Sequence, residues 1–187
     1  MVRTEHPPGL CCQSTPKPPA FTGKKTDFCL NAGSVLFLIF FERKCEMIVV
    51  KRVKDRSMYD TACRIRIEVF VREQGVPEEI EMDEYDTTAE HVVAFRFGKP
   101  VGCGRIVILN GSAKIGRVAV IKAERGKGIG RKICEELIKI AAEKGINKFV
   151  LNSQLTAVGF YKKLGFEAVG EIFTEAGIEH VKMLMEV

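Results

Sequence analysis

The sequence has no tryptophan, and its 3 tyrosines and 12 phenylalanines are not interleaved with lysine or arginine. Proteins that bind single strands of nucleic acid need aromatic side chains beside basic ones, because the bases stack on the rings. The net charge is only +5 at pH 7, and no long run of basic residues concentrates it. No recognition motif for nucleic acid is present, so we predict no nucleic-acid partner.

Paired metal ligands are also missing. The 7 cysteines contain no Cys-x-x-Cys pair, and the 3 histidines have no ligand spacing. Because zinc sites usually show such pairs, we predict no metal. Cys103 and Cys134 fall in an apolar strand and on a helix, where a free cysteine usually packs as a small hydrophobic residue. Free thiols fit a reducing compartment, and we predict a cytoplasmic protein.

The apolar run from Ser34 to Phe41 is too short to cross a bilayer, which takes about 20 residues. Charged Glu42, Arg43 and Lys44 follow it, where a signal peptide would need small residues for cleavage. We therefore predict no membrane anchor. Residues 1–46 are rich in proline and lack periodicity, so we expect them to be disordered or a non-native extension upstream of Met47.

Residues 118–133 are the most informative segment. The apolar strand Val118, Ala119, Val120 runs into a turn with glycine at 126, 128 and 130, and an amphipathic helix follows. Glycines at the beginning of a helix leave its first amides accessible, so that a phosphate can approach the backbone. The segment therefore predicts an anion-binding turn.

The spacing of the turn excludes two common nucleotide sites. A Walker A loop ends in Gly-Lys-Ser/Thr, but Arg131 and Lys132 follow Gly130. The dinucleotide fingerprint needs a third glycine where Arg131 stands. The remaining pattern, Arg125-x-x-Gly128-x-Gly130, resembles the pyrophosphate signature of the GNAT superfamily of N-acetyltransferases. A glycine-rich connection between a strand and a helix, without a ligand, is the simpler alternative.

Two other segments extend the resemblance to about residues 48–187. The pattern Phe160-Tyr161-x-x-x-Gly165-Phe166 resembles the second half of the GNAT core. Residues 66–77 with Glu81 and Asp83, and the closing residues 175–180, are similar to a small YjcF/ElaA-like branch. The resemblance implies that acetyl-CoA is the ligand. It implies cofactor contacts from Val118, Ala119, Val120, Arg125, Gly126, Lys127, Gly128, Ile129, Gly130, Asn152 and Phe160.

The resemblance also implies catalytic roles. Tyr161 falls at the position of the general acid, and Glu73 and Asp83, with Glu81, match the acceptor-side pattern that would supply a base. The carboxylates of residues 77–86 would attract a cationic amine or accept its proton through water, unless the segment is only a solvated loop. A water chain without a dedicated base stays open.

One departure from the family pattern and one ambiguity accompany these roles. Ala157 stands where many family members carry an asparagine that contacts pantetheine, and Asn152 is not a clear replacement. Arg66 and Arg117 would bind an anionic acceptor, or would be surface residues paired with neighbouring acids.

Hydrophobic periodicity predicts a single α/β (α+β) domain at residues 47–187. We expect strands at residues 48–53, 91–97, 101–109, 114–121, 148–152, 166–173 and 178–186. A helix is expected around Met58 to Val69, with Met58, Ala62, Ile65 and Val69 at helical spacing on its inward face. A second is expected from the glycine turn to Gly145, with Ile129, Ile133, Leu137 and Ile140 as its buried stripe, and a third at 155–164. Together with the resemblance, this predicts the GNAT acyl-CoA N-acyltransferase fold, a mixed, mostly antiparallel twisted sheet flanked by helices.

The predicted function is transfer of an acetyl group from acetyl-CoA to a primary amine of a small molecule, with amino-sugar phosphates as one acceptor class. The alternative is a non-catalytic acyl-CoA-binding regulatory module that keeps the anion-binding turn. Exposed edge strands in this architecture would permit a homodimer.

Overall fold

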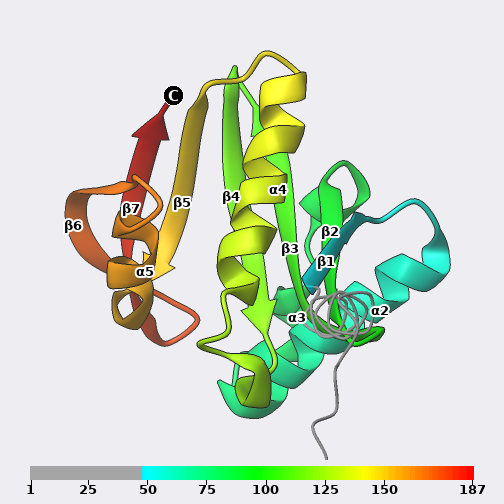
Figure 1. Ribbon diagram of the computed structural model, residues 1–187. Helices are drawn as coiled ribbons and strands as arrows, with labels where there is room; N and C mark the ends of the chain where they lie inside the picture. Colours follow the sequence, from blue (N-terminus) through cyan, green and yellow to red (C-terminus); the bar gives the residue numbers. More distant parts are fainter. Residues whose placement is uncertain (1–47) are drawn as a thin grey trace, which may run out of the picture.

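The computed structural model describes residues 48–187, which form a mixed sheet of seven strands in the order β1-β2-β3-β4-β5-β7-β6 (Figure 1). The strands are β1 Ile48–Arg52, β2 Glu90–Arg96, β3 Lys99–Leu109, β4 Ser112–Val120, β5 Lys148–Gln154, β6 Glu167–Glu175 and β7 Ile178–Glu186. Within this described part, β4 and β5 are the only parallel neighbours. The predicted sheet is confirmed, whereas the predictions for residues 1–46 lie outside the described residues.

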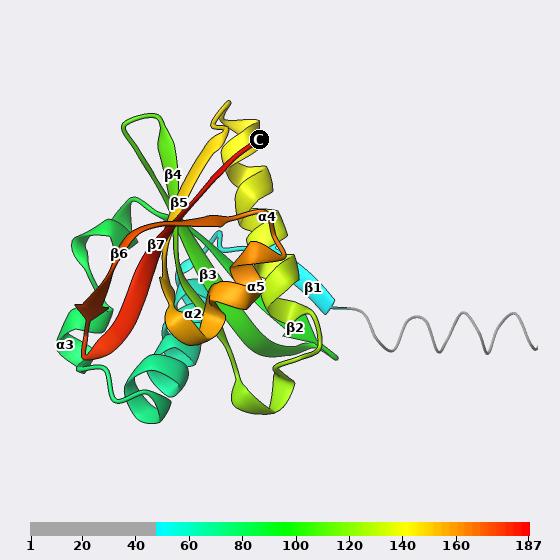
Figure 2. The same cartoon turned by 90° about the vertical axis from the view of Figure 1, so that its left-hand side faces the viewer.

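Helices cover both faces of the sheet (Figure 2). Helix α4, Ile129–Glu143, packs on the face that carries Val92 and Ala94 of β2. Helix α2, Arg56–Arg66, packs on the opposite face with Val93. These three β2 residues are 0% exposed, because successive side chains of a strand point to opposite faces and both faces are covered.

Helix α2 follows the predicted apolar spacing. It begins after Asp55, whose carboxylate accepts a hydrogen bond from the Met58 amide at 2.9 Å. Ala62, Ile65 and Val69 are buried, which confirms the predicted inward face. The helix continues as a π-helical segment, Ile67–Glu73, and the short helix α3, Glu78–Glu81, comes next. A single 3₁₀ turn, Glu84–Thr87, then leads into β2.

Helix α4 also confirms its predicted stripe. Ile129, Ile133, Leu137 and Ile140 are each at most 1% exposed. The helix ends before Gly145, whose positive φ of 74° closes the last turn. The third predicted helix is shorter than expected: a 3₁₀ turn at Leu155–Ala157 leads into α5, Val158–Lys162.

Strands β4 and β5 diverge along their length. They pair only at Ala113 with Phe149 and at Lys114 with Val150, and then separate toward the end of β4 where α4 begins (Figure 1). The sheet ends at β1 and β6, and the predicted homodimer, which rests on these edges, stays a prediction. No helix within residues 48–187 is long and apolar enough to span a membrane.

Candidate active site

The glycine turn lies between β4 and α4. Gly126 and Gly128 have φ values of 78° and 80°, and a Cβ added at either would find no atom within 4 Å. The first helical hydrogen bond of α4 runs from the Lys132 amide to the Gly128 carbonyl at 3.2 Å. Among residues 48–187, the amides from Gly126 to Arg131 donate to no protein acceptor. The turn therefore presents consecutive free N–H groups beside open space, the arrangement that binds a phosphate.

The basic side chains of the turn are engaged by the protein itself. Arg125 donates from Nε to the Val120 carbonyl at 2.9 Å, and its two Nη atoms contact the Glu73 carboxylate at 2.6 Å each. Lys127 Nζ donates to the Ala123 carbonyl at 2.8 Å. Anion binding at this turn would consequently come from the backbone, with these side chains holding the loop.

Glu73 is held in that bidentate pair, and hydrogen bonds from Arg125 lower its pKa below the usual value. A proton acceptor needs a free lone pair and a pKa close to the working pH. This geometry suits a role in which Glu73 positions Arg125. Its predicted role as a base stays a prediction.

Gly130 and Phe160 form a contact between α4 and α5. A Cβ added at Gly130 would lie 3.3 Å from Cζ of Phe160. The side chain of Ile129 is 1% exposed and belongs to the core, so only its backbone can face a ligand. The glycine is thus needed for close packing as well as for access to the amides.

Strand β4 carries a bulge where it approaches this turn. Cys103 of β3 pairs with Ala119, but Arg105 pairs with Gly116, so two β4 residues lie opposite one residue of β3. One of the two, Arg117, has a φ of 53°, a left-handed conformation that is rare for a residue with a side chain. The bulge interrupts the hydrogen-bond ladder just before Val118, where the resemblance places contacts with pantetheine.

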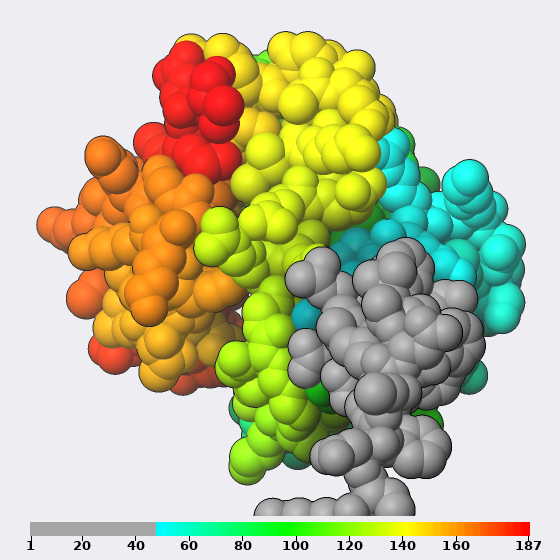
Figure 3. All heavy atoms as spheres, in the orientation of Figure 1, coloured from blue at the N-terminus to red at the C-terminus, as the bar shows by residue number. Residues whose placement is uncertain are grey.

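A cavity of about 500 Å³ opens between the diverging strands β4 and β5. Val118, Asn152, Ala157 and Tyr161 line it on the side of the predicted cofactor. Asp83, Arg117 and residues of the β6–β7 hairpin line the other side. In the space-filling view the surface is hollowed between the yellow-green glycine turn and the orange segment that contains α5 (Figure 3).

Tyr161 on α5 faces this cavity. Its ring is held edge-on by Phe160 and Phe166, with centroid separations of 4.9 and 5.9 Å. Its hydroxyl makes no hydrogen bond to any residue in the described range, and burial raises its pKa above the ordinary value. A tyrosine in this state stays protonated at neutral pH, so its hydroxyl presents a proton donor to the cavity.

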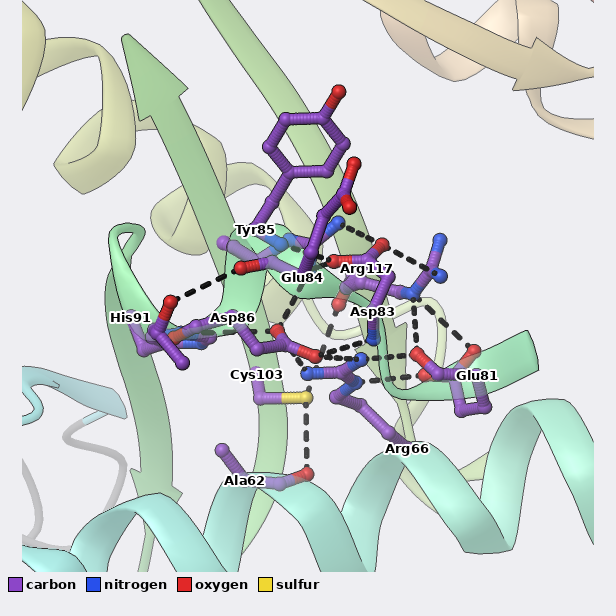
Figure 4. Close-up of polar contacts among 12 residues, drawn as sticks. Ala62, Arg66, Glu81, Asp83, Glu84, Tyr85, Asp86, His91, Cys103 and Arg117 are labelled. Carbon is purple, nitrogen blue, oxygen red and sulfur yellow. Dashed lines mark hydrogen bonds and ion pairs between the residues drawn. The ribbon is translucent and has the colours of Figure 1, made fainter. Parts of the chain in front are cut away.

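Three arginines and three carboxylates form a network behind the cavity (Figure 4). Arg66, which is 1% exposed, donates to Glu81 at 2.7 Å and to Asp86 at 2.7 and 3.0 Å. Arg105 donates to Asp83 at 2.5 and 2.8 Å and to Asp86 at 2.7 Å.

Arg117 completes the network. Its Nη2 donates to Asp83 at 3.2 Å, and its Nε lies 3.3 Å from a Glu81 carboxylate oxygen. Segment 78–87 is therefore tied to α2, β3 and β4 by charged hydrogen bonds.

This network corrects two expectations. The carboxylates of segment 77–86 do not form one solvated, cation-attracting cluster: Glu81 and Asp86 are 2% and 7% exposed and are neutralised by arginine, whereas Glu78, Glu79 and Glu84 are exposed. Arg66 cannot bind an acceptor, because it is buried and fully occupied. Burial acts to raise the pKa of Asp83, but hydrogen bonds and charge from Arg105 hold it below its usual value. Asp83 lines the cavity, and its predicted role as a base stays a prediction.

Asp86 is expected to make the free energy of unfolding fall as the pH is lowered into the acid range. Burial acts to raise its pKa, but hydrogen bonds and charge from Arg66 and Arg105 lower the pKa to about 2. The unfolded chain should titrate this group near 3.9. Because the folded pKa is the lower one, the stabilisation is present above about pH 4 and is lost as the pH falls toward 2.

We expect a loss on the order of 2 kcal/mol from Asp86 over this range, measured by urea denaturation at stepped pH. Asp86→Asn should remove that part of the pH dependence. An unchanged slope in this variant would assign the acid sensitivity to other groups.

The sequence interpretation missed several cavity residues. Gln154, Glu175 and His180 line the cavity from β5, β6 and β7, whereas residues 175–180 were noted only as part of the resemblance. The signal that would find them is strand alternation, which places Ile178 and His180 on the face opposite buried Val181 and Met183.

The described cysteines Cys63, Cys103 and Cys134 are free thiols. Burial raises the pKa of both Cys103 and Cys134 to about 12, so these two act as packing residues, as predicted. Within the part of the chain that the structure describes, no group of three His, Cys, Asp or Glu side chains is arranged to hold a metal ion.

Comparison with known proteins agrees with this geometry. A family model described as an acetyltransferase (GNAT) domain matches residues 54–187. The uncharacterized N-acetyltransferase YjcF of Bacillus subtilis is 42% identical over 134 residues, which cover 71% of this chain and 96% of YjcF.

Two solved structures share the fold. The crystal structure of Escherichia coli ElaA has a TM-score of 0.67 at 25% identity, covering 75% of this chain and 100% of ElaA. A GNAT family acetyltransferase from Elizabethkingia anophelis with acetyl-CoA bound has a TM-score of 0.57 at 19% identity, covering 75% and 98%. The chain belongs to the GNAT family of acetyltransferases. It is an acyltransferase with the fold that the sequence predicted.

Proposed function

We propose that this protein transfers the acetyl group of acetyl-CoA to a primary amine of a small molecule. The observation that carries the proposal is the row of free amides from Gly126 to Arg131, at the end of the strand whose Val118 lines the cavity. These amides fit a pyrophosphate. The solved relative from Elizabethkingia anophelis, which has acetyl-CoA bound, supports the choice of thioester through its shared fold.

The chemistry follows from the residues around the cavity. The amine nitrogen attacks the thioester carbonyl, a C–N bond forms, and the C–S bond breaks. Val118 lines the cavity at the end of β4, and we assign thioester binding to the backbone amides of Val118 to Val120; preorganised donors of this kind contribute about 3 kcal/mol to the transition state. Tyr161 gives its proton to the departing sulfur.

The acceptor enters from the side of the cavity opposite α5. Lys114 lines this space and makes no ion pair with another residue in the range 48–187. An amine that also carries an anionic group would find a partner there, so amino-sugar phosphates are the acceptor class to test first. The arginines that line the cavity, Arg105 and Arg117, are paired with carboxylates and contribute less.

Ligand-induced stabilisation tests the binding step. Acetyl-CoA at about 100 times its Kd should stabilise the protein by about 2.7 kcal/mol and raise its Tm. S-acetylpantetheine lacks the pyrophosphate, so at the same concentration it should raise the Tm much less. Equal shifts from the two thioesters would show that the turn from Gly126 to Arg131 binds no pyrophosphate.

A screen of amines with thiol detection tests catalysis. The panel contains amino sugars with and without a phosphate, polyamines and amino acids. The enzyme should release free CoA only when an accepted amine is present. Acetyl-CoA stabilisation without thiol release from any amine would favour the alternative, a non-catalytic acyl-CoA-binding module.

A further inference from the structure

The amine acceptor must lose a proton, because an ammonium with a pKa near 10 cannot attack a carbonyl. Two of the carboxylates that line the cavity are already occupied. Glu81 is 2% exposed and pairs with Arg66 at 2.7 Å. Asp83 accepts two hydrogen bonds from Arg105, at 2.5 and 2.8 Å, and one from Arg117. Glu81 is buried in its ion pair, and both oxygens of Asp83 are taken up by arginine, so neither is an available proton acceptor.

The β6–β7 hairpin brings an imidazole to the same cavity. His180 of β7 pairs in register with Gln154 of β5 and Phe173 of β6, and both Gln154 and His180 line the cavity. The adjacent residue Val181 points into the core on the other face of the strand. Strand alternation therefore holds His180 toward the cavity.

The ring of His180 is held in one tautomer. Its Nδ1 lies 2.8 Å from the carbonyl oxygen of Ile178. A carbonyl only accepts, so Nδ1 carries the hydrogen, and the neutral ring keeps its lone pair on Nε2. Nε2 has no hydrogen-bond partner among the residues that the structure describes. The ring also stacks on Phe173, with centroids 6.0 Å apart and planes 25° apart.

We propose that His180 is the general base of the acetyl transfer, an assignment that rests on the proposed function. The ammonium first loses one proton through Nε2 to solvent, and as the neutral amine attacks and the C–N bond forms, Nε2 takes the second proton from the nitrogen. Tyr161 supplies the proton that the thiolate gains as the C–S bond breaks. Solvent then removes the proton from the imidazolium and returns one to the tyrosine, so that the cycle is balanced.

Other titratable groups reach the cavity from the surrounding elements. They are Glu175 on β6, Tyr161 on α5, Glu81 on α3, Asp83 and Tyr85 before β2, Arg105 on β3, and Lys114 and Arg117 on β4. Glu175 accepts a hydrogen bond from the Asn152 amide at 3.0 Å, which ties the tip of the hairpin to β5. We assign Glu175 to positioning of the hairpin. The variant Glu175→Gln removes its carboxylate and so tests whether Glu175, rather than His180, is the base.

The test uses an amine that the wild-type protein accepts in the screen. His180→Gln should lower turnover at least about 100-fold and should keep the Tm shift caused by acetyl-CoA. The wild-type profile of kcat/KM should fall on the acid side, and His180→Gln should lose that acid limb. Glu175→Gln should keep the acid limb of the profile. Glu179→Gln changes an exposed carboxylate next to His180 on the face of β7 that turns away from the cavity; it is the matched control and should match the wild type.

Two results would overturn the assignment while leaving the proposed function intact. One is a His180→Gln variant that retains more than about a third of wild-type turnover, and the other is loss of the acid limb in Glu175→Gln instead. A wild-type protein that releases no thiol with any amine would overturn the proposed function and the base together.

Discussion

Replacing Arg66 with methionine is expected to lower the free energy of unfolding by about 3–5 kcal/mol. The change keeps an extended side chain but removes the cation between Glu81 and Asp86, which are 2% and 7% exposed. Buried carboxylates without their main partner carry the full desolvation cost of their charge. Urea denaturation at pH 7 measures the loss.

Two companion variants separate charge burial from helix effects. Arg64→Met lies on the exposed side of α2 and should change stability by at most about 0.5 kcal/mol. Adding Glu81→Gln and Asp86→Asn to Arg66→Met should recover part of the loss, because neutral amides cost less to bury. A loss below about 1 kcal/mol in Arg66→Met would mean that Arg105 and Arg117 alone neutralise both carboxylates.

Tyr161→Phe is expected to slow thiol release about 10³-fold without weakening the binding of acetyl-CoA. The substitution removes one hydroxyl and leaves the ring, so the contacts with Phe160 and Phe166 remain. The thiolate must then leave without a proton donor, and its departure becomes slower. Steady-state kinetics with thiol detection measure kcat and KM for the accepted amine.

The ligand-induced Tm shift is the control for this variant, because an unchanged shift shows that the thioester site is intact. Turnover within about threefold of wild type would contradict the assignment of Tyr161 as the acid. A lower kcat at unchanged KM for acetyl-CoA is the signature of an interaction made only in the transition state.

Local sequence patterns predicted most of the fold. The spacing of Ile129, Ile133, Leu137 and Ile140 predicted the inward stripe of α4, and each of these residues is buried. Gly145 ended the helix where expected. These predictions succeeded because helical periodicity and turn chemistry depend on residues within one or two turns of each other. The third predicted helix was less accurate, since its first residues, Leu155–Ala157, form a 3₁₀ turn.

In the candidate site, too, local features were predictable and long-range contacts were not. The glycine turn was predictable, since positive φ values at Gly126 and Gly128 are a local property of glycine. The arginine partner of each carboxylate was not predictable. Glu73 pairs with Arg125, 52 residues away in the sequence, and Asp83 pairs with Arg105, 22 residues away. No sequence window contains both partners of either pair.

The sequence by itself determined the strand-turn-helix unit and the strands of the sheet, because these depend on the period and chemistry of neighbouring residues, and Tyr161 was indicated by the family resemblance of its pattern. Only the tertiary structure decided which charges are free. Packing of α2, β3 and β4 brings Arg66, Arg105 and Arg117 onto the acidic segment, and the β6–β7 hairpin brings His180 to the cavity. Charge pairing depends on distance in space, and the folded sheet sets that distance between residues far apart in the chain.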